Sequence, residues 1–240
     1  MENSSDLKVA WIREMGEDWV GINYEYSNEG FEKRGWSVTR FTNPDVPDMR
    51  EGDIIHGTVE DIQYKLGDKM PNVSDYPEPL KVSCMYREIQ EDTLENVRGK
   101  TGVFVKPKEH KLFSGFCAER ELDWRKTKRL DDDKEIYFTP IVEDFQSEWR
   151  VYVLNGEVEA VGHYKGDPTV FPESHRIEKM LKDWNSQPVS FAMDVAVREI
   201  YGTVLMEVNE MMTAGVYGIQ PVTYEKLIEK RWEEFWNRKD

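Results

Sequence analysis

The chain has 240 residues, of which 39% are hydrophobic and 33% charged, as in a folded globular protein rather than a disordered one. No apolar run is long enough for a membrane-spanning helix, so we expect no membrane partner. The formal net charge of −15 repels nucleic-acid phosphates and argues against non-specific nucleic-acid binding.

Residues 1–98 are predicted to form a small α/β domain. Short apolar runs indicate three strands, and a longer segment that ends near Gly35 indicates one helix. The strands fall at residues 8–12, 36–41 and 53–56, and the helix falls at residues 18–33. Because strands that alternate with helices form α/β layers, this part of the chain is expected to carry its own sheet.

From residue 99 onward most predicted strands are joined as hairpins, which indicates an α+β fold with a second domain over residues 99–240. Residues 70–79 contain three prolines and are predicted to be a surface loop. Residues 224–238 are predicted to form an amphipathic helix that closes the core. The apolar face of this helix contains Leu227, Ile228, Trp232, Phe235 and Trp236.

Two lysines follow an apolar strand predicted at residues 101–105. Lys106 ends the strand, and Lys111 precedes a possible tight loop at Ser114 and Gly115. Two ammonium groups beside such a loop would suit a phosphate. The alternative for Lys106 is an edge residue whose stem covers apolar surface while its charge stays in water.

A hairpin is predicted at Asn155-Gly156, between two alternating runs. Symmetric pairing about this turn sets Glu148 opposite His163. The same pairing sets Arg150 opposite Val161. One face is then polar and contains Glu148, Arg150, Tyr152, Glu159 and His163. The other face packs and contains Trp149, Val151, Val153, Val158, Ala160 and Tyr164. Taken alone, this pattern also fits an ordinary half-solvated sheet.

A second hairpin is predicted within residues 190–218, with its turn at 198–202. Its pairing sets Asp194 opposite Glu207, and Asn209 has the same facing. The opposite, apolar face contains Phe191, Met193, Val195, Val197, Val204, Met206 and Val208. Facing carboxylates destabilise a sheet unless a cation lies between them. Oxygen ligands alone favour magnesium over zinc, so this hairpin predicts a magnesium site; the alternative is a solvated face.

In this order, the three segments resemble the ATP-grasp superfamily, in particular the clade named for two arginines and a lysine. The resemblance covers roughly residues 99–218. It rests on the sequences FVKP, KLFSGF, VEDF and SEWRVYV, and on DVAV followed by LMEVNE. Residues 1–98 resemble the small α/β domain that precedes ATP-grasp cores. The resemblance therefore implies an ATP-grasp fold with such an N-terminal domain.

The resemblance also implies a role for each residue that matches a motif. ATP would be held at its phosphates by Lys106 and Lys111, at its adenine by Glu143, Asp144 and Phe145, and at its ribose by Glu148. Arg150 would reach the reacting phosphate, and Arg87 in MYREI is our choice for the second arginine. Magnesium would be bound by Asp194, Glu207 and Asn209. Residues 213–218 would close over the acyl acceptor site. The clade often has an Arg-Tyr pair where this chain has His163-Tyr164.

The activity implied is that of a magnesium-requiring ligase that activates a carboxylate as an acyl phosphate and passes it to an amine. Its partners would be small-molecule, peptide or protein carboxylates and amines. A kinase that phosphorylates a hydroxyl and a non-catalytic nucleotide-binding protein are the alternatives. The family occurs in bacteria and their viruses, so the resemblance implies the cytosol of a bacterial or virus-infected bacterial cell.

Overall fold

The computed structural model describes residues 8–14, 19–42, 49–67, 75–81, 86–109 and 112–237. Its first sheet is parallel, with strand order β2-β1-β3. The elements of this unit are β1 (Val9–Arg13), α1 (Trp19–Lys33), β2 (Ser37–Phe41), β3 (Ile54–His56) and α2 (Val59–Leu66). The strands and the first helix lie where the sequence predicts them, to within a residue or two.

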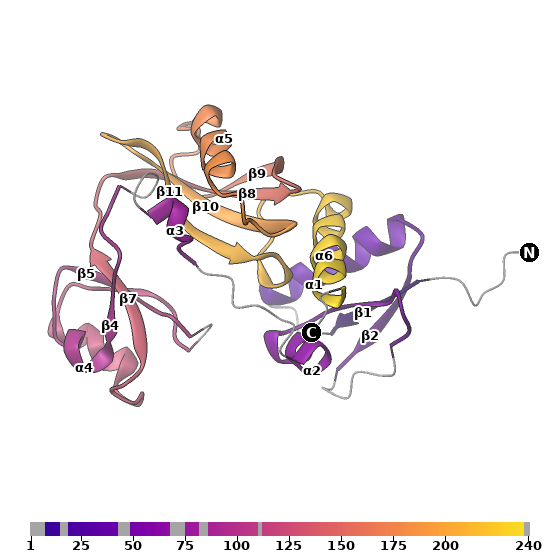
Figure 1. The fold of residues 1–240 in the computed structure, drawn as a ribbon, viewed down its shortest axis with the longest axis horizontal. Helices are drawn as coiled ribbons and strands as arrows, with labels where there is room; N and C mark the ends of the chain where they lie inside the picture. The colour runs from indigo at the N-terminus through magenta and orange to yellow at the C-terminus, as the bar shows by residue number, and fades with distance from the viewer. Residues whose placement is uncertain are drawn as a thin grey trace, which may run out of the picture.

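A second sheet is antiparallel, with strand order β4-β7-β5-β6, and forms a separate lobe (Figure 1). Its elements are β4 (Gln90–Thr93), α4 (Leu94–Val97), β5 (Val103–Pro107), β6 (Phe116–Ala118), the 3-10 helix η2 (Glu121–Thr127) and β7 (Glu135–Pro140). Because β4 pairs with β7, residues 90–97 belong to this lobe. The boundary predicted after residue 98 therefore falls inside the lobe and not ahead of it.

The third sheet is also antiparallel, has the order β11-β10-β8-β9, and lies between the other two units (Figure 1). Its elements are β8 (Phe145–Leu154), β9 (Glu157–Gly166), α5 (Ser174–Asp183), β10 (Ser190–Arg198), β11 (Gly202–Glu210), the 3-10 helix η3 (Met211–Thr213) and α6 (Pro221–Trp236). The short helix α3 (Glu78–Lys81) begins within the predicted loop, and its Leu80 packs into the core of this sheet.

The β8–β9 hairpin turns at Asn155 and Gly156, whose φ angles of 51° and 80° are those of a tight turn. The predicted register is wrong because two β-bulges interrupt the pairing. Glu148 faces Lys165 instead of His163, and Arg150 faces Gly162 instead of Val161. Because of the bulges, three residues of β9 lie on the face opposite to the one predicted. His163 packs on Trp149, whereas Tyr164 lies on the side of Glu148 and Ala160 faces Tyr152. Strand β8 is buried from residue 147 to 154, so the half-solvated alternative does not hold for this strand; strand β9 is exposed at residues 157–159, 161 and 165–166.

The β10–β11 hairpin turns where predicted and pairs Asp194 with Glu207, as expected. A bulge after Asp194 then shifts the register, so that Val195 faces Leu205. As a result Leu205 packs in the apolar core, while Met206 faces a pocket on the other side. The placement of Met206 on the apolar face is therefore wrong, and so is that of Val204, which faces Ala196 on the side of Asp194.

Helix α6 closes the core as predicted, lying beside α1 (Figure 1). Leu227, Ile228 and Phe235 are fully buried, but Trp236 is 39% exposed and lies at the margin of the apolar face. No helix of the described segments has the length and apolar character that crossing a membrane requires.

His56, at the end of β3, joins the N-terminal sheet to the rest of the core. Its Nδ1 lies 2.7 Å from the Ser27 hydroxyl, and the rings of Tyr24 and Tyr224 flank it at 4.9 and 6.0 Å. Burial lowers the pKa of His56 to about 3, although a hydrogen bond with the backbone of Met212 opposes the shift.

This burial predicts a stability that depends on pH. Between pH 6.5 and 3 His56 is protonated in the unfolded chain but neutral in the folded chain. The free energy of unfolding therefore falls as the pH drops below 6.5. The expected slope is at most about 1.4 kcal/mol per pH unit. Urea unfolding at pH 7 and pH 5 measures the change in the free energy of unfolding. Subtracting the change measured for His56→Gln removes the contributions of the other titratable groups. Equal slopes in the two proteins would contradict the prediction.

Candidate functional site

A pocket with a cavity volume of about 300 Å³ lies between the two antiparallel sheets. Its size suits a small-molecule ligand. One part is apolar and is lined by Phe104, Ile141, Val142, Phe145 and Met206. The polar part is lined by Arg87, Glu148, Lys165, Asp194 and Glu207, together with Tyr76 and Tyr164.

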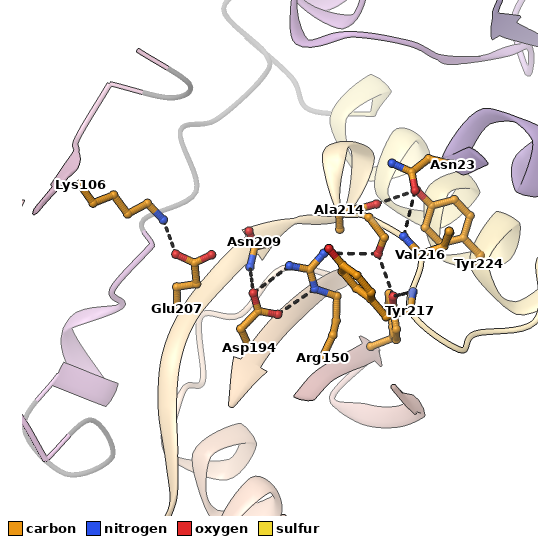
Figure 2. Close-up of polar contacts among 12 residues, drawn as sticks. Asn23, Lys106, Arg150, Asp194, Glu207, Asn209, Ala214, Val216, Tyr217 and Tyr224 are labelled. Atoms are coloured by element: carbon orange, nitrogen blue, oxygen red, sulfur yellow. Dashed lines mark hydrogen bonds and ion pairs between the residues drawn. The ribbon is translucent and has the colours of Figure 1, made fainter. Parts of the chain in front are cut away.

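Lys106, on β5, reaches from the lobe to the third sheet at the edge of this pocket. Its ammonium group forms ion pairs with Glu207 and, at 2.9 Å, with Asp75 (Figure 2 shows the first). The side chain of Lys106 is 19% exposed, so the predicted alternative of a solvated edge residue does not hold. Burial lowers its pKa, but Glu207 and Asp75 outweigh that effect and raise the pKa above its usual value.

Arg150, on β8, is paired with Asp194 on the neighbouring strand β10. Its Nε and Nη2 donate to the two carboxylate oxygens at 2.7 and 2.8 Å, in the bidentate geometry that a guanidinium favours. The Nδ2 of Asn209 donates to the same carboxylate at 3.2 Å (Figure 2). Arg150 is 8% exposed, so it is buried and not part of a solvated face.

The facing carboxylates of Asp194 and Glu207 are therefore each compensated by a protein cation. Burial, together with the charge of Glu207, keeps the pKa of Asp194 above its usual value although Arg150 opposes the shift. Burial raises the pKa of Glu207 as well, but Lys106 and Arg150 outweigh burial and hold it below its usual value. The repulsion that predicted a metal is thus balanced by Arg150 and Lys106 in the protein alone.

The donor set at this position fits magnesium. Asp194, Glu207 and Asn209 supply only oxygen ligands, and both carboxylates line the same pocket. No group of three or more His, Cys, Asp or Glu side chains suited to a metal occurs among the residues described. A magnesium site here would therefore need oxygens from outside the protein, as magnesium commonly does when it binds phosphates.

Arg87, which the motif comparison selected as the second arginine, lines the pocket. Its Nη2 donates to the carbonyl oxygen of Met206 at 2.5 Å, and its buried Nε has no hydrogen-bond partner among the residues that the structure describes. Burial lowers the pKa of Arg87. A buried guanidinium with a spare donor is suited to an anionic ligand.

Of the remaining residues predicted to bind ATP, some line the pocket and others do not. Glu148 lines the pocket and accepts a 2.6 Å hydrogen bond from Lys165. Of the three residues predicted at the adenine, only Phe145 lines the pocket. Glu143 is exposed, and Asp144 accepts from Arg198 at 2.8 Å at the end of β10. In the segment that follows β7, the apolar Ile141 and Val142 line the cavity, whereas the carboxylates of Glu143 and Asp144 do not. Lys111 lies outside the described residues.

Sequence reasoning missed two residues near Lys106. Asp75 pairs with this lysine, and its carbonyl oxygen accepts from the backbone of Val208 on β11. Tyr76 is 1% exposed and lines the pocket. No sequence signal marked them, because residues 70–79 were predicted to be a surface loop and that prediction does not place the segment against β11.

This architecture, with two antiparallel sheets around a pocket edged by lysine, arginine and paired carboxylates, is that of the ATP-grasp fold. A family model for the ATP-grasp domain matches residues 85–227; it describes family 2 of the clade named for two arginines and a lysine. The chain belongs to this family. Among curated proteins, none matches the sequence.

Solved structures share the fold over nearly the whole chain. D-alanine–D-alanine ligase from Bacillus anthracis in complex with ATP is 13% identical, with a TM-score of 0.61 over 96% of this chain and 99% of that chain. The macrocyclase MdnC from Microcystis aeruginosa, bound to its precursor peptide MdnA, is 12% identical, with a TM-score of 0.55 over 92% and 99%. The ATP-grasp ligase PsnB, with a minimal precursor variant, Mg and ADP, is 12% identical, with a TM-score of 0.54 over 98% and 99%.

Proposed function

We propose that the protein is an ATP-dependent carboxylate–amine ligase that requires magnesium. The observation that carries this proposal is the line of alternating charges at the pocket: Lys106, Glu207, Asp194 and Arg150 (Figure 2). Paired carboxylates between two protein cations can exchange their present partners for a metal ion and phosphate oxygens. The apolar part of the pocket beside this line suits a nucleobase.

Each group has a role in this proposal. Asp194, Glu207 and Asn209 would hold magnesium, which would neutralise phosphate charge when bound. Lys106, Arg87 and Arg150 would then face the triphosphate as cations, with Lys111 assigned to the phosphates by the motif resemblance alone. Phe145 packs at the apolar end, and Glu148 would hold the ribose. The protein thus positions the reactants and stabilises charge.

The reaction has two steps. A carboxylate oxygen of the acyl donor attacks the γ-phosphorus of ATP, forming a new O–P bond while the bond to the ADP oxygen breaks. An amine then attacks the acyl carbon, so that a C–N bond forms, phosphate leaves and the amine loses a proton. The buried Arg150 and the half-buried Lys106 offset, as cations, the negative charge that moves during phosphoryl transfer.

The substrates are a carboxylate and an amine, carried by small molecules, peptides or proteins. D-alanine–D-alanine ligase represents small-molecule ligases of this fold, and MdnC and PsnB are bound to precursor peptides. The products separate the proposal from its rivals. A ligase releases ADP and free phosphate with the joined product, whereas a kinase releases ADP and a phosphorylated product.

Magnesium and ATP together should stabilise the fold more than ATP alone, because Asp194 and Glu207 repel a triphosphate that lacks the metal. A hundredfold excess of Mg·ATP over its Kd raises the free energy of unfolding by about 2.7 kcal/mol. Thermal melting with ATP, with magnesium and with both measures the effect, and calorimetry gives the Kd. An unchanged melting temperature at saturating Mg·ATP would contradict the proposed function.

A further inference from the structure

Residues 214–217, between η3 and α6, follow no regular structure, yet their backbone is held by side chains from distant elements (Figure 2). Tyr152 makes two of these contacts with one hydroxyl group. Its oxygen donates to the carbonyl oxygen of Gly215 at 2.8 Å and accepts from the backbone amide of Tyr217 at 2.8 Å. A phenylalanine in its place would leave both backbone groups without this partner.

Two further contacts hold the intervening positions. The Oδ1 of Asn23, on α1, accepts from the amide of Val216 at 2.9 Å. The buried hydroxyl of Tyr224, on α6, donates to the carbonyl oxygen of Ala214 at 2.7 Å. Each of four consecutive residues therefore has one backbone group fixed by a side chain, from α1, β8 or α6.

Arg150 links this segment to the charged line at the pocket. Its Nε and Nη2 hold Asp194, while its Nη1 donates to the carbonyl oxygen of Gly215 at 3.3 Å. Tyr152 follows Arg150 by two residues on β8, so both side chains project from the same face. The carbonyl oxygen of Gly215 thus accepts from both residues, and one guanidinium joins the segment to Asp194.

Tyr217 fixes the segment against β8 and β9. The guanidinium of Arg150 lies 4.9 Å from the centre of its ring, and the ring of Tyr164 lies at 5.1 Å. Gly162, on β9, leaves room for its backbone, since a methyl group there would overlap the Tyr217 carbonyl oxygen. Because Tyr164 lines the pocket, residues 214–217 adjoin the pocket at its Asp194 end.

We propose that Tyr152 is a positioning residue that fixes residues 214–217 as a wall of the amine-acceptor site and, with Arg150, couples this wall to the phosphate end of the pocket. The assignment of the acceptor site rests on the proposed function. The coupling follows because Arg150 and Tyr152 donate to the same carbonyl oxygen, that of Gly215. A phosphate that draws Arg150 away from Asp194 also changes the hydrogen bond from Arg150 to this oxygen. The hydrogen bonds of Tyr152 then determine whether the backbone of residues 214–217 stays in position.

The test compares the parent protein with Tyr152→Phe, using Mg·ADP as the probe. Amide hydrogen exchange of Val216 and Tyr217, followed by NMR, reports whether the side-chain contacts to the backbone of residues 214–217 are intact. In Tyr152→Phe we expect exchange at Tyr217 to rise about tenfold, as for the loss of one hydrogen bond. Mg·ADP should alter exchange at these amides in the parent but not in Tyr152→Phe, while its Kd stays within about twofold. Tyr64→Phe, at a 67% exposed tyrosine, is the matched control.

Two variants of the half-buried Asn23 provide a second test. This test does not depend on whether Tyr152→Phe folds. Asn23→Leu removes the acceptor for Val216 and should raise its exchange. Asn23→Asp keeps an oxygen at this position and should restore protection. A purely structural contact would raise exchange without removing the response to Mg·ADP, so the loss of that response in Asn23→Leu supports the coupling.

Parent-like exchange and an intact Mg·ADP response in Tyr152→Phe and Asn23→Leu would overturn the proposal. Faster exchange spread evenly over β8 and β10 would overturn it too, since it would mark general destabilisation. If the parent itself does not bind Mg·ADP, the proposed function fails, and so does the coupling. If the parent binds Mg·ADP and only the exchange results disagree, the ligase proposal stands and the positioning role does not.

Discussion

Replacement of Glu207 by glutamine should lower ATP turnover by about 10²- to 10³-fold, the usual effect of removing one electrostatic contact to the reacting groups. Glutamine keeps the shape of the side chain but removes a charge that magnesium needs. We therefore also expect half-maximal turnover to require more magnesium. ADP release as a function of magnesium concentration measures both effects, with slow ATP hydrolysis as the assay until substrates are known.

The stability of Glu207→Gln should stay close to that of the parent, because two effects oppose each other. The change removes the repulsion between Glu207 and Asp194, which alone would stabilise the metal-free protein. It also removes the ion pair with Lys106, which keeps Asp75 as its remaining partner. From the sequence alone only the first effect is visible, since nothing in it places Lys106 on Glu207.

Glu199→Gln is the matched control, because Glu199 is exposed in the turn of the same hairpin. It removes the same charge and should leave turnover and magnesium dependence unchanged. If Glu207→Gln unfolds, Glu207 serves a structural polar network. If it turns over within a few-fold of the parent, the magnesium assignment to this hairpin fails.

The hairpin that carries Asp194 and Glu207 could be predicted because side chains alternate along a strand and a turn separates two apolar runs. Its detailed register could not be derived in this way: the turn pairs Arg198 with Gly202, which alone would set Asp194 opposite Met206, and the bulge after Asp194 brings Glu207 opposite it instead. The Asn155–Gly156 turn was equally clear, and its positive φ angles are those such a turn requires. The three strands of the first sheet also follow from short apolar runs between breakers.

The bulges could not be predicted, since an extra residue in a strand changes the register without changing the alternating pattern. This is why His163 and Tyr164 were assigned to the wrong faces and Met206 to the core. Contacts from distant segments were equally hidden. Asp75 reaches Lys106 only because Tyr76 and Leu80 pack into the core of the third sheet, a consequence of tertiary packing that no local pattern contains.

Arg150→Lys should reduce turnover by about 10²-fold or more while leaving ATP binding nearly unchanged. A lysine can approach Asp194 with one ammonium group, but it cannot reproduce two parallel hydrogen bonds and a third to Gly215. Burial makes some loss of stability unavoidable, on the order of 1–3 kcal/mol for imperfectly satisfied groups. Urea unfolding and ADP release measure the two effects separately.

Arg231 supplies a control that shares the chemistry of Arg150 but not its location. It is 1% exposed on α6, and its Nε and Nη2 donate to both carboxylate oxygens of Glu210 at 2.9 and 2.7 Å. Arg231→Lys therefore disrupts the same kind of buried bidentate pair away from the pocket. The two variants should lose similar stability, so only a role at the reacting phosphate predicts that Arg150→Lys alone loses turnover. Equal turnover in the two would make Arg150 a structural partner of Asp194 and weaken the ligase proposal with it.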